Sequence, residues 1–252
     1  MDLHYELTGP ANAPVVVFSN SLGADLSMWD TQAPELSRHF RVLRYDTRGH
    51  GKSSLPAAPH DVASLGGDLL GLLDSLSLSQ VSLCGLSLGA MTGMWLALHA
   101  PQRLRKLILC SGAAKIGTQE SWNTRIELVN HSGMQAVVPG ILERWFTADF
   151  RARSPEAVRP TQVMLERASV SGYVAGCAAV RDTDLRQILH EIAVPTLVVN
   201  GASDPVTPPA DGKFLAERIP AARYIELAGA HLFNVESSQE FTRELLQFLA
   251  SA

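Results

Sequence analysis

The stretch Val81-Ser82-Leu83-Cys84-Gly85-Leu86-Ser87-Leu88-Gly89-Ala90 decides the fold, because it joins an apolar run, a sharp turn and the start of a helix. Residues 81–84 are expected to form a buried strand, and residues 90–100 continue with a helical pattern. The two flanking glycines lack a Cβ, so the chain can turn sharply and hold Ser87 in a strained conformation. The turn therefore predicts a serine hydroxyl lifted above a sheet, at the positive end of the following helix.

Apolar runs of the same kind recur along the chain and alternate with helical stretches. Several are apolar at consecutive positions, as strands covered on both faces require. This alternation predicts an α/β fold with a mostly parallel, doubly wound sheet flanked by helices. Residues 3–7 alternate instead and predict an antiparallel edge hairpin. The predicted buried strands are residues 15–18, 42–45, 81–84, 107–110, 196–199 and 224–227.

The rhythm of strand and helix breaks between residues 115 and 190. This stretch is mostly compatible with helices, contains Trp122 and Trp145, and has no strand of the buried kind. An insertion of that length between late core strands predicts a helical lid over the ends of the sheet. Residues 1–114 and 191–252 then form the core domain. The alternative is a set of additional structural helices that cover a face of the sheet.

A serine hydroxyl is a poor nucleophile at neutral pH and needs a base that an acid holds in one tautomer. In sites of this strand-turn-helix kind, the chain order is serine, acid, histidine. Of the histidines after Ser87, only His231 lies in a loop beyond the last strand-like run, so it is the predicted base. His99 is expected at a helix end, and His131 and His190 belong to the insertion.

The acid is expected in the loop that leaves the preceding strand. Asp204 follows residues 196–199 there, with Pro205 stiffening the loop. A turn aspartate that satisfies the local backbone is the alternative interpretation. The loop after residues 107–110 offers no carboxylate, and Asp211 starts a helix.

Attack on a carbonyl also needs hydrogen-bond donors where negative charge develops. The backbone N–H of Leu88, directly after the nucleophile, is the first predicted donor. The second is expected from the loop after residues 15–18, at the N–H of Leu22. Both assignments rest on position alone, because a backbone donor has no side-chain signature.

The bulk properties exclude several other classes. The chain has 252 residues and a net charge of −4, with no basic run that could follow a phosphate backbone, so we expect no nucleic-acid partner. It has neither a signal peptide nor an uninterrupted run of about 18 apolar residues, so a cytoplasmic protein without a membrane span is predicted. Cys84, Cys110 and Cys177 are interpreted as small buried hydrophobes.

No metal or cofactor is predicted. Residues 48–53 contain a Gly-Lys-Ser triplet, but Asp46 stands where a phosphate loop needs its first glycine, and His50 is interpreted as a structural loop residue. No glycine-rich dinucleotide motif follows the first predicted strand. No His, Cys or carboxylate cluster has the spacing of metal ligands.

The whole chain resembles the α/β-hydrolases and, more closely, the 3-oxoadipate enol-lactonases of the β-ketoadipate pathway. Many relatives carry His-Gly where this chain has Asn20-Ser21, a substitution that fits the lactonase group. The resemblance rests on the stretches at residues 19–23, 28–30, 45–53 and 84–91 and on the Asp204 and His231 loops.

The resemblance implies hydrolysis of 3-oxoadipate enol-lactone to 3-oxoadipate in bacterial breakdown of aromatic compounds. Ser87 would attack the lactone carbonyl, and the ring would open with an enolate leaving group. Direct attack by water, with Ser87 only assisting, is the alternative mechanism.

Within the fold, the alternative functions are those of a carboxylesterase, a perhydrolase-like enzyme or a carbon–carbon bond hydrolase. A ligand receptor that barely turns over is an alternative from another class. The sequence leaves open whether the chain forms a homo-oligomer.

The lactone carries a free carboxylate, so its pocket should present a cation or dipoles. We expect the lid to supply walls and charge through Trp122, Arg125, Arg144 and Trp145. Arg125 lies three residues after Trp122, on the same face of a predicted helix. The alternative is that these are ordinary surface arginines and core tryptophans.

Overall fold

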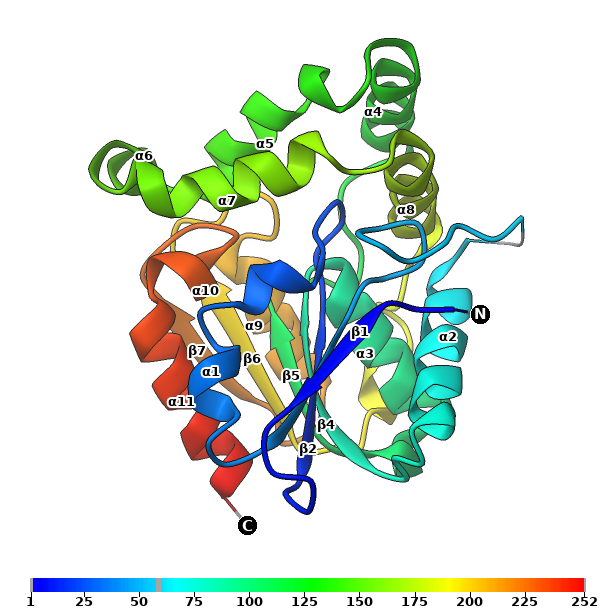
Figure 1. Ribbon diagram of the computed structural model, residues 1–252, viewed down its shortest axis with the longest axis vertical. Helices are drawn as coiled ribbons and strands as arrows, with labels where there is room; N and C mark the ends of the chain where they lie inside the picture. The colour runs from blue at the N-terminus through cyan, green and yellow to red at the C-terminus, as the bar shows by residue number, and fades with distance from the viewer. Residues whose placement is uncertain (1, 58–59, 252) are drawn as a thin grey trace.

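Seven strands form one sheet in the order β1-β3-β2-β4-β5-β6-β7 (Figure 1). The computed structural model describes residues 2–57 and 60–251. Every neighbouring pair of strands is parallel except β1 and β3. The predicted mostly parallel α/β sheet is therefore confirmed. Its strands are β1 (Tyr5–Thr8), β2 (Val15–Ser19), β3 (Arg41–Tyr45), β4 (Val81–Leu86), β5 (Leu104–Cys110), β6 (Thr196–Gly201) and β7 (Arg223–Leu227).

The central strands are buried on both faces, as their continuous apolar runs predicted. Every residue of β4 and of β6 is buried. Each fully buried large apolar side chain stabilises the fold by roughly 1.5–3 kcal/mol relative to exposure. Both strands run two residues beyond the predicted apolar stretch, because pairing continues to Leu86 opposite Cys110 and to Gly201 opposite Leu227.

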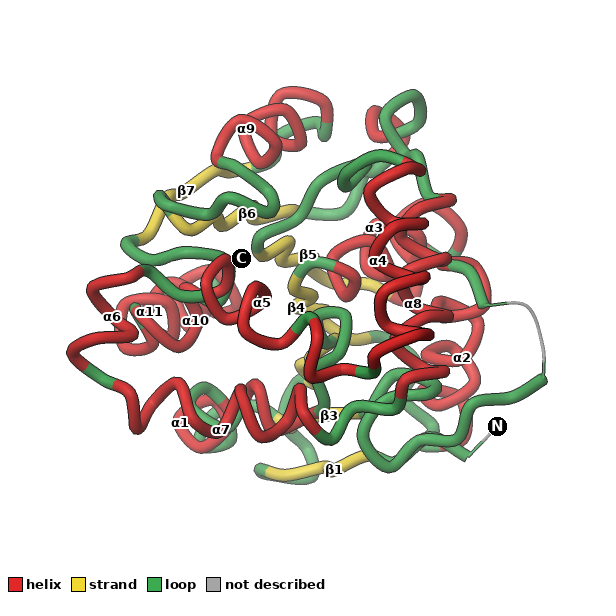
Figure 2. Tube along the Cα trace, turned by 90° about the horizontal axis from the view of Figure 1, so that it is seen from above, coloured by secondary structure: helices red, strands yellow, loops and turns green. Residues whose placement is uncertain are grey.

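Helices cover both faces of the sheet. Figure 2 shows α1 and α11 on one face and α2, α3 and α9 on the other. The last helix buries a stripe of apolar side chains at helical spacing, namely Phe241, Leu245, Phe248 and Leu249. These helices and the short α10 span α1 (Ala33–Leu36), α2 (Val62–Ser75), α3 (Leu88–His99), α9 (Pro209–Arg218), α10 (Phe233–Glu236) and α11 (Ser238–Ala250).

Five further helices, here called the inserted helices, lie between β5 and β6 in the chain and above the sheet in Figure 1. Helix α4 packs against α8, and α5 packs against α7. No helix among residues 2–57 and 60–251 is both long and apolar enough to cross a membrane. The inserted helices are α4 (Gln119–Ser132), α5 (Val138–Trp145), α6 (Ala148–Arg153), α7 (Pro155–Glu166) and α8 (Val170–Asp182).

The prediction that residues 3–7 form an antiparallel hairpin is wrong, because a hairpin would pair β1 with β2, the next strand in the chain. β1 does lie antiparallel at the edge of the sheet, but it pairs with β3 through contacts such as Tyr5 opposite Tyr45. The parallel crossover from β2 through α1 places β3 directly beside β2. The edge next to β2 is therefore filled, and β1 pairs with the outer side of β3.

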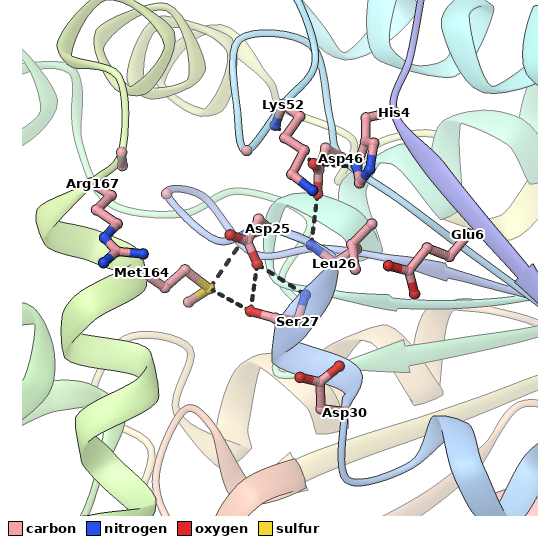
Figure 3. Close-up of a pocket in the computed structure, with 13 residues that line it drawn as sticks. His4, Glu6, Asp25, Leu26, Ser27, Asp30, Asp46, Lys52, Met164 and Arg167 are labelled. Atoms are coloured by element: carbon pink, nitrogen blue, oxygen red, sulfur yellow. Dashed lines mark hydrogen bonds and ion pairs between the residues drawn. The ribbon is translucent and has the colours of Figure 1, made fainter.

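The loop after β3 is held by one buried carboxylate. Asp46 Oδ1 accepts the N–H of Leu26 at 2.8 Å, and its Oδ2 accepts the N–H of Lys52 at 2.9 Å. The same Oδ2 lies 2.9 Å from Nδ1 of His4 (Figure 3). Ser53 donates its hydroxyl to the Asp46 carbonyl oxygen at 2.7 Å. Asp46 thus fastens the residue before β1, the loop after β3 and the segment after β2.

Two neighbouring glycines of α2 predict opposite effects on stability. A Cβ at Gly66 would lie 1.9 Å from the ring of Trp95, whereas a Cβ at Gly67 would meet nothing within 4 Å. Gly66→Ala should destabilise the protein by about 1–3 kcal/mol, because the helix–helix contact is overpacked. Gly67→Ala should stabilise it by about 0.5–1 kcal/mol, because alanine fixes the helical backbone better than glycine.

Urea unfolding of both variants beside the unchanged protein measures these free energies. The two variants share helix, residue type and exchange, so each controls for the other. Equal effects of both substitutions would contradict the close packing of α2 on Trp95.

Candidate active site

Ser87 stands in a strained backbone conformation between β4 and α3. Its φ of 57° and ψ of −109° are rarely adopted by a residue with a side chain. A Cβ at Gly85 would lie 2.1 Å from the carbonyl oxygen of Gly89, and a Cβ at Gly89 would lie 2.2 Å from that of Ser19. Only glycine fits at both positions, so the turn can close tightly around the serine.

The two backbone N–H groups predicted to stabilise negative charge belong to Leu88, directly after Ser87, and to Leu22, in the loop after β2. Leu88 is the first residue of α3, and the first N–H groups of a helix have no partner within it. Leu22 is buried in the loop after β2. That loop is fixed by Asn20, whose Nδ2 donates to the Tyr45 carbonyl at 2.8 Å and whose Oδ1 accepts Nε1–H of Trp29 at 2.9 Å.

His231 and Asp204 form a buried pair. Nδ1 of His231 lies 2.8 Å from Oδ2 of Asp204, and their side chains are 1% and 0% exposed. Because the carboxylate accepts a hydrogen bond from Nδ1–H, the neutral imidazole presents Nε2 as a proton acceptor. The pair therefore has the tautomer that a general base requires.

The loop after β6 keeps Asp204 ionised. Its Oδ1 accepts the N–H groups of Val206 at 2.7 Å and Thr207 at 3.1 Å, and its Oδ2 accepts the Thr207 hydroxyl at 2.8 Å. Burial by itself would raise the pKa of this carboxyl, but the attraction of His231 and these hydrogen bonds hold the pKa below its ordinary value. Asp204 thus carries a negative charge at neutral pH.

The segment that carries His231 is tied to its surroundings. The hydroxyl of Ser111, at the end of β5, donates to the His231 carbonyl oxygen at 2.8 Å. On the other side, the N–H of Leu232 donates to the carbonyl oxygen of Trp145 at 2.9 Å. The Trp145 ring lies 6.0 Å from the imidazole, centroid to centroid. The inserted helices therefore contact the histidine directly.

Two arginines of the inserted helices gather around Tyr173. The guanidinium of Arg125 lies 5.1 Å from the centre of the Trp122 ring, and its Nη1 lies 3.5 Å from the Tyr173 hydroxyl. Burial lowers the pKa of Arg144, and the nearby charge of Arg125 lowers it further. Burial raises the pKa of Tyr173 to about 12, so its hydroxyl stays protonated. The charge of Arg125 thus acts on Arg144, so these two cations of the inserted helices lie in the same region.

The Tyr173 ring links this cationic group to the loop after β2. A Cβ on Gly23 would lie 3.0 Å from that ring, and a Cβ on Gly176 of α8 would lie 2.4 Å from the side chain of Leu22. Helix α8 thus packs directly over the loop that offers the Leu22 N–H.

The sequence-predicted residues follow three strands of the run β4-β5-β6-β7. Ser87, Asp204 and His231 follow the carboxyl ends of β4, β6 and β7, and these ends meet at one edge of a parallel sheet. The sequence missed the supporting contacts of Ser111 and Thr207, which no local pattern marks. Within the described ranges 2–57 and 60–251, no group of three or more His, Cys, Asp or Glu could hold a metal ion.

The chain is similar in sequence to a known protein family and to several known enzymes. Residues 14–135 match the family described as alpha/beta hydrolase fold. The 3-oxoadipate enol-lactonase 2 of Acinetobacter baylyi is 42% identical over 239 residues, which cover 95% of this chain and 90% of that protein. The 3-oxoadipate enol-lactonase 1 of the same organism is 35% identical over 249 residues, covering 99% and 93%.

A solved structure is similar over almost the whole length. The crystal structure of the enol-lactonase from Burkholderia xenovorans LB400 matches with a TM-score of 0.97 and 43% sequence identity, covering 99% of this chain and 96% of that one. The sheet order and the strained serine after β4 define the class of protein, a hydrolase that acts on ester bonds. The chain belongs to the α/β-hydrolase family and, within it, to the 3-oxoadipate enol-lactonases.

The hydroxyl of Thr207 predicts a pH-dependent contribution to stability. Burial raises the pKa of Asp204, but the attraction and hydrogen bond of His231, the N–H of Val206 and the Thr207 hydroxyl together hold the pKa below the unfolded value of about 4, so the ionised carboxylate stabilises the fold above that pH. This contribution is lost as the pH falls through the folded pKa. Thr207→Val should therefore lower the free energy of unfolding at pH 7 by about 1–3 kcal/mol.

Thr207→Ser keeps the hydroxyl and is the matched control. In urea unfolding, the difference between the two variants should shrink as the pH falls from about 4, the unfolded value, through the lower pKa of Asp204 in the folded protein, where the folded carboxyl becomes protonated. A difference that does not change with pH would show that Thr207 contributes by packing alone.

Proposed function

We propose that this enzyme hydrolyses 3-oxoadipate enol-lactone to 3-oxoadipate, with Ser87 as nucleophile, His231 as base and Asp204 as the orienting acid. The observation that carries the proposal is the buried His231–Asp204 pair, joined at 2.8 Å, on the sheet edge where the strained Ser87 also stands. The curated relatives named for this lactone support the choice of substrate. The proposed place of the reaction is the breakdown of aromatic compounds in the bacterial cytoplasm.

In the first half of the reaction, the Ser87 hydroxyl attacks the lactone carbonyl as its proton passes to Nε2 of His231. Asp204 stabilises the imidazolium that forms. Negative charge on the carbonyl oxygen is met by the N–H groups of Leu22 and Leu88. The carbon–oxygen bond of the ring then breaks, and the leaving enolate takes the proton from His231.

The second half releases the acyl group from Ser87. The freed enol converts to the ketone, which makes ring closure unfavourable. A water molecule then gives a proton to His231 and attacks the ester on Ser87. His231 returns this proton to the Ser87 oxygen as the ester bond breaks. The serine hydroxyl is restored and 3-oxoadipate is released.

The free carboxylate of the substrate is proposed to bind Arg125 and Arg144, with Trp122 and Trp145 as walls. Charge-assisted hydrogen bonds from a guanidinium to a carboxylate are stronger than neutral ones. Burial and then the charge of Arg125 lower the pKa of Arg144, and a bound anion would offset the repulsion between the two arginines. Selectivity for an anionic lactone over a neutral ester follows.

Replacement of the nucleophile tests the proposed reaction. Hydrolysis of the enol-lactone and of a neutral aryl ester is measured by absorbance for the unchanged protein and for Ser87→Ala. We expect kcat/KM on the lactone to exceed that on the ester by several orders of magnitude. In Ser87→Ala, kcat should fall by roughly 10⁴-fold or more on both substrates, because the serine and histidine act as a unit.

Full lactone hydrolysis by Ser87→Ala would contradict the proposed nucleophile. Equally slow rates on lactone and ester in the unchanged protein would contradict the proposed substrate and would favour a carboxylesterase.

Removal of one arginine tests the carboxylate site. Arg125→Ala should lower kcat/KM on the anionic lactone by about 10- to 100-fold, because this is the loss in binding expected when a hydrogen bond to a charged group is removed. The neutral aryl ester should change by less than about threefold. Arg153→Ala is the control, because Arg153 is an exposed arginine of α6 that pairs with Asp149. Equal losses on both substrates would contradict a role in binding the carboxylate.

A further inference from the structure

Glu236 joins two segments that are far apart in the sequence. Its Oε1 accepts the N–H of Ala230 at 2.9 Å and the N–H of Thr147 at 3.0 Å. Its Oε2 accepts the hydroxyl of Thr147 at 2.7 Å. Ala230 directly precedes His231, and Thr147 lies between α5 and α6. One carboxylate therefore connects the histidine segment to the inserted helices.

A second connection lies on the other side of the histidine. The N–H of Leu232 donates to the carbonyl oxygen of Trp145 at 2.9 Å. The two residues that flank His231 are thus both bonded to the short stretch from Trp145 to Thr147, directly or through Glu236. A shift of the His231 backbone would therefore also move this stretch, which carries the tryptophan beside the imidazole.

The backbone before His231 is held by Glu236 together with two other hydrogen bonds, in which the N–H of Ser203 donates to the Gly229 carbonyl oxygen at 2.9 Å and the Ser237 hydroxyl donates to the Ala228 carbonyl oxygen at 2.7 Å. Gly229 has a φ of +118°, a conformation that favours glycine. Its Cβ, if present, would lie 3.1 Å from Cβ of Glu236, so the two residues are in close contact. Loss of the carboxylate would leave the N–H of Ala230 and that of Thr147 without their acceptor.

We propose that Glu236 is a positioning residue that holds the imidazole of His231 in place and couples it to the inserted helices. The inference rests on the proposed role of His231 as base. A misplacement of about 1 Å at a reacting group can cost about 100-fold in rate. The carboxylate touches no reacting atom, so its removal acts through the position of the histidine.

Two substitutions separate positioning from charge. Glu236→Ala removes both acceptor oxygens. Glu236→Gln keeps one oxygen for the two N–H groups, and its amide can donate to the Thr147 hydroxyl. Glu240→Ala is the matched control, because Glu240 lies in α11 and pairs with the exposed Arg243. We measure kcat and KM on the lactone and on a neutral aryl ester, well below the melting temperature of each variant.

For Glu236→Ala we expect kcat to fall by about 10- to 100-fold on both substrates, with KM changed by less than about threefold. Glu236→Gln should restore kcat to within about threefold of the unchanged protein, and Glu240→Ala should leave it unchanged. A purely structural role would lower the melting temperature without moving kcat in the folded fraction. Unchanged kcat in Glu236→Ala, or an equal loss in Glu236→Gln, overturns the proposal.

Glu236→Asp serves as a second variant where Glu236→Ala does not fold. The shorter side chain keeps the charge but cannot reach both segments, so kcat should fall between the values of the Gln and Ala variants. An unchanged kcat for Glu236→Asp would equally count against positioning. Ser87→Ala, measured in the same assays, reports on the triad itself: its full activity would remove the proposed function whatever the Glu236 variants show.

Discussion

The strained backbone at Ser87 is the constraint on which the rest of the site depends. A positive φ at a serine persists only where its surroundings fix it. Here the surroundings are the ladder of β4, the helix α3 that starts at the next residue, and the two glycines that allow contact with Gly89 and Ser19. The strain places the hydroxyl at a helix N-terminus, where negative charge is stabilised. The other groups of the site are arranged around that fixed point.

The edge of the sheet and the inserted helices bring different groups to the surroundings of Ser87. The edge of the sheet supplies the serine, the histidine and a carboxylate that its hydrogen bonds keep ionised. The inserted helices carry Arg125, Arg144 and Trp145. Under the proposed function, the sheet sets the type of reaction and the inserted helices set the choice of substrate. Glu236 bonds to both parts, so under our proposal it fixes the position of His231 relative to the inserted helices.

Sequence patterns predicted the sheet well, because buried parallel strands need continuous apolar runs and each run leads into a turn. The strand-turn-helix around Ser87 and the loop positions of Asp204 and His231 followed from the same logic. The partner of β1 was not predictable, because a local alternation says nothing about which edge is already filled. Thr207, Ser111 and Glu236 were missed for a related reason: their hydrogen bonds join segments or loop atoms that only the folded chain brings together.

The most direct test of the central claim is to find where a covalent inhibitor reacts and what this does to lactone hydrolysis. The protein is treated with a fluorophosphonate, which phosphonylates an activated serine, and is then digested for mass spectrometry while residual lactone hydrolysis is followed. The account predicts one label per chain, on Ser87, with activity lost in proportion to labelling and with protection by the lactone. Complete labelling of Ser87 with lactone hydrolysis intact would contradict it, as would loss of activity through labelling elsewhere.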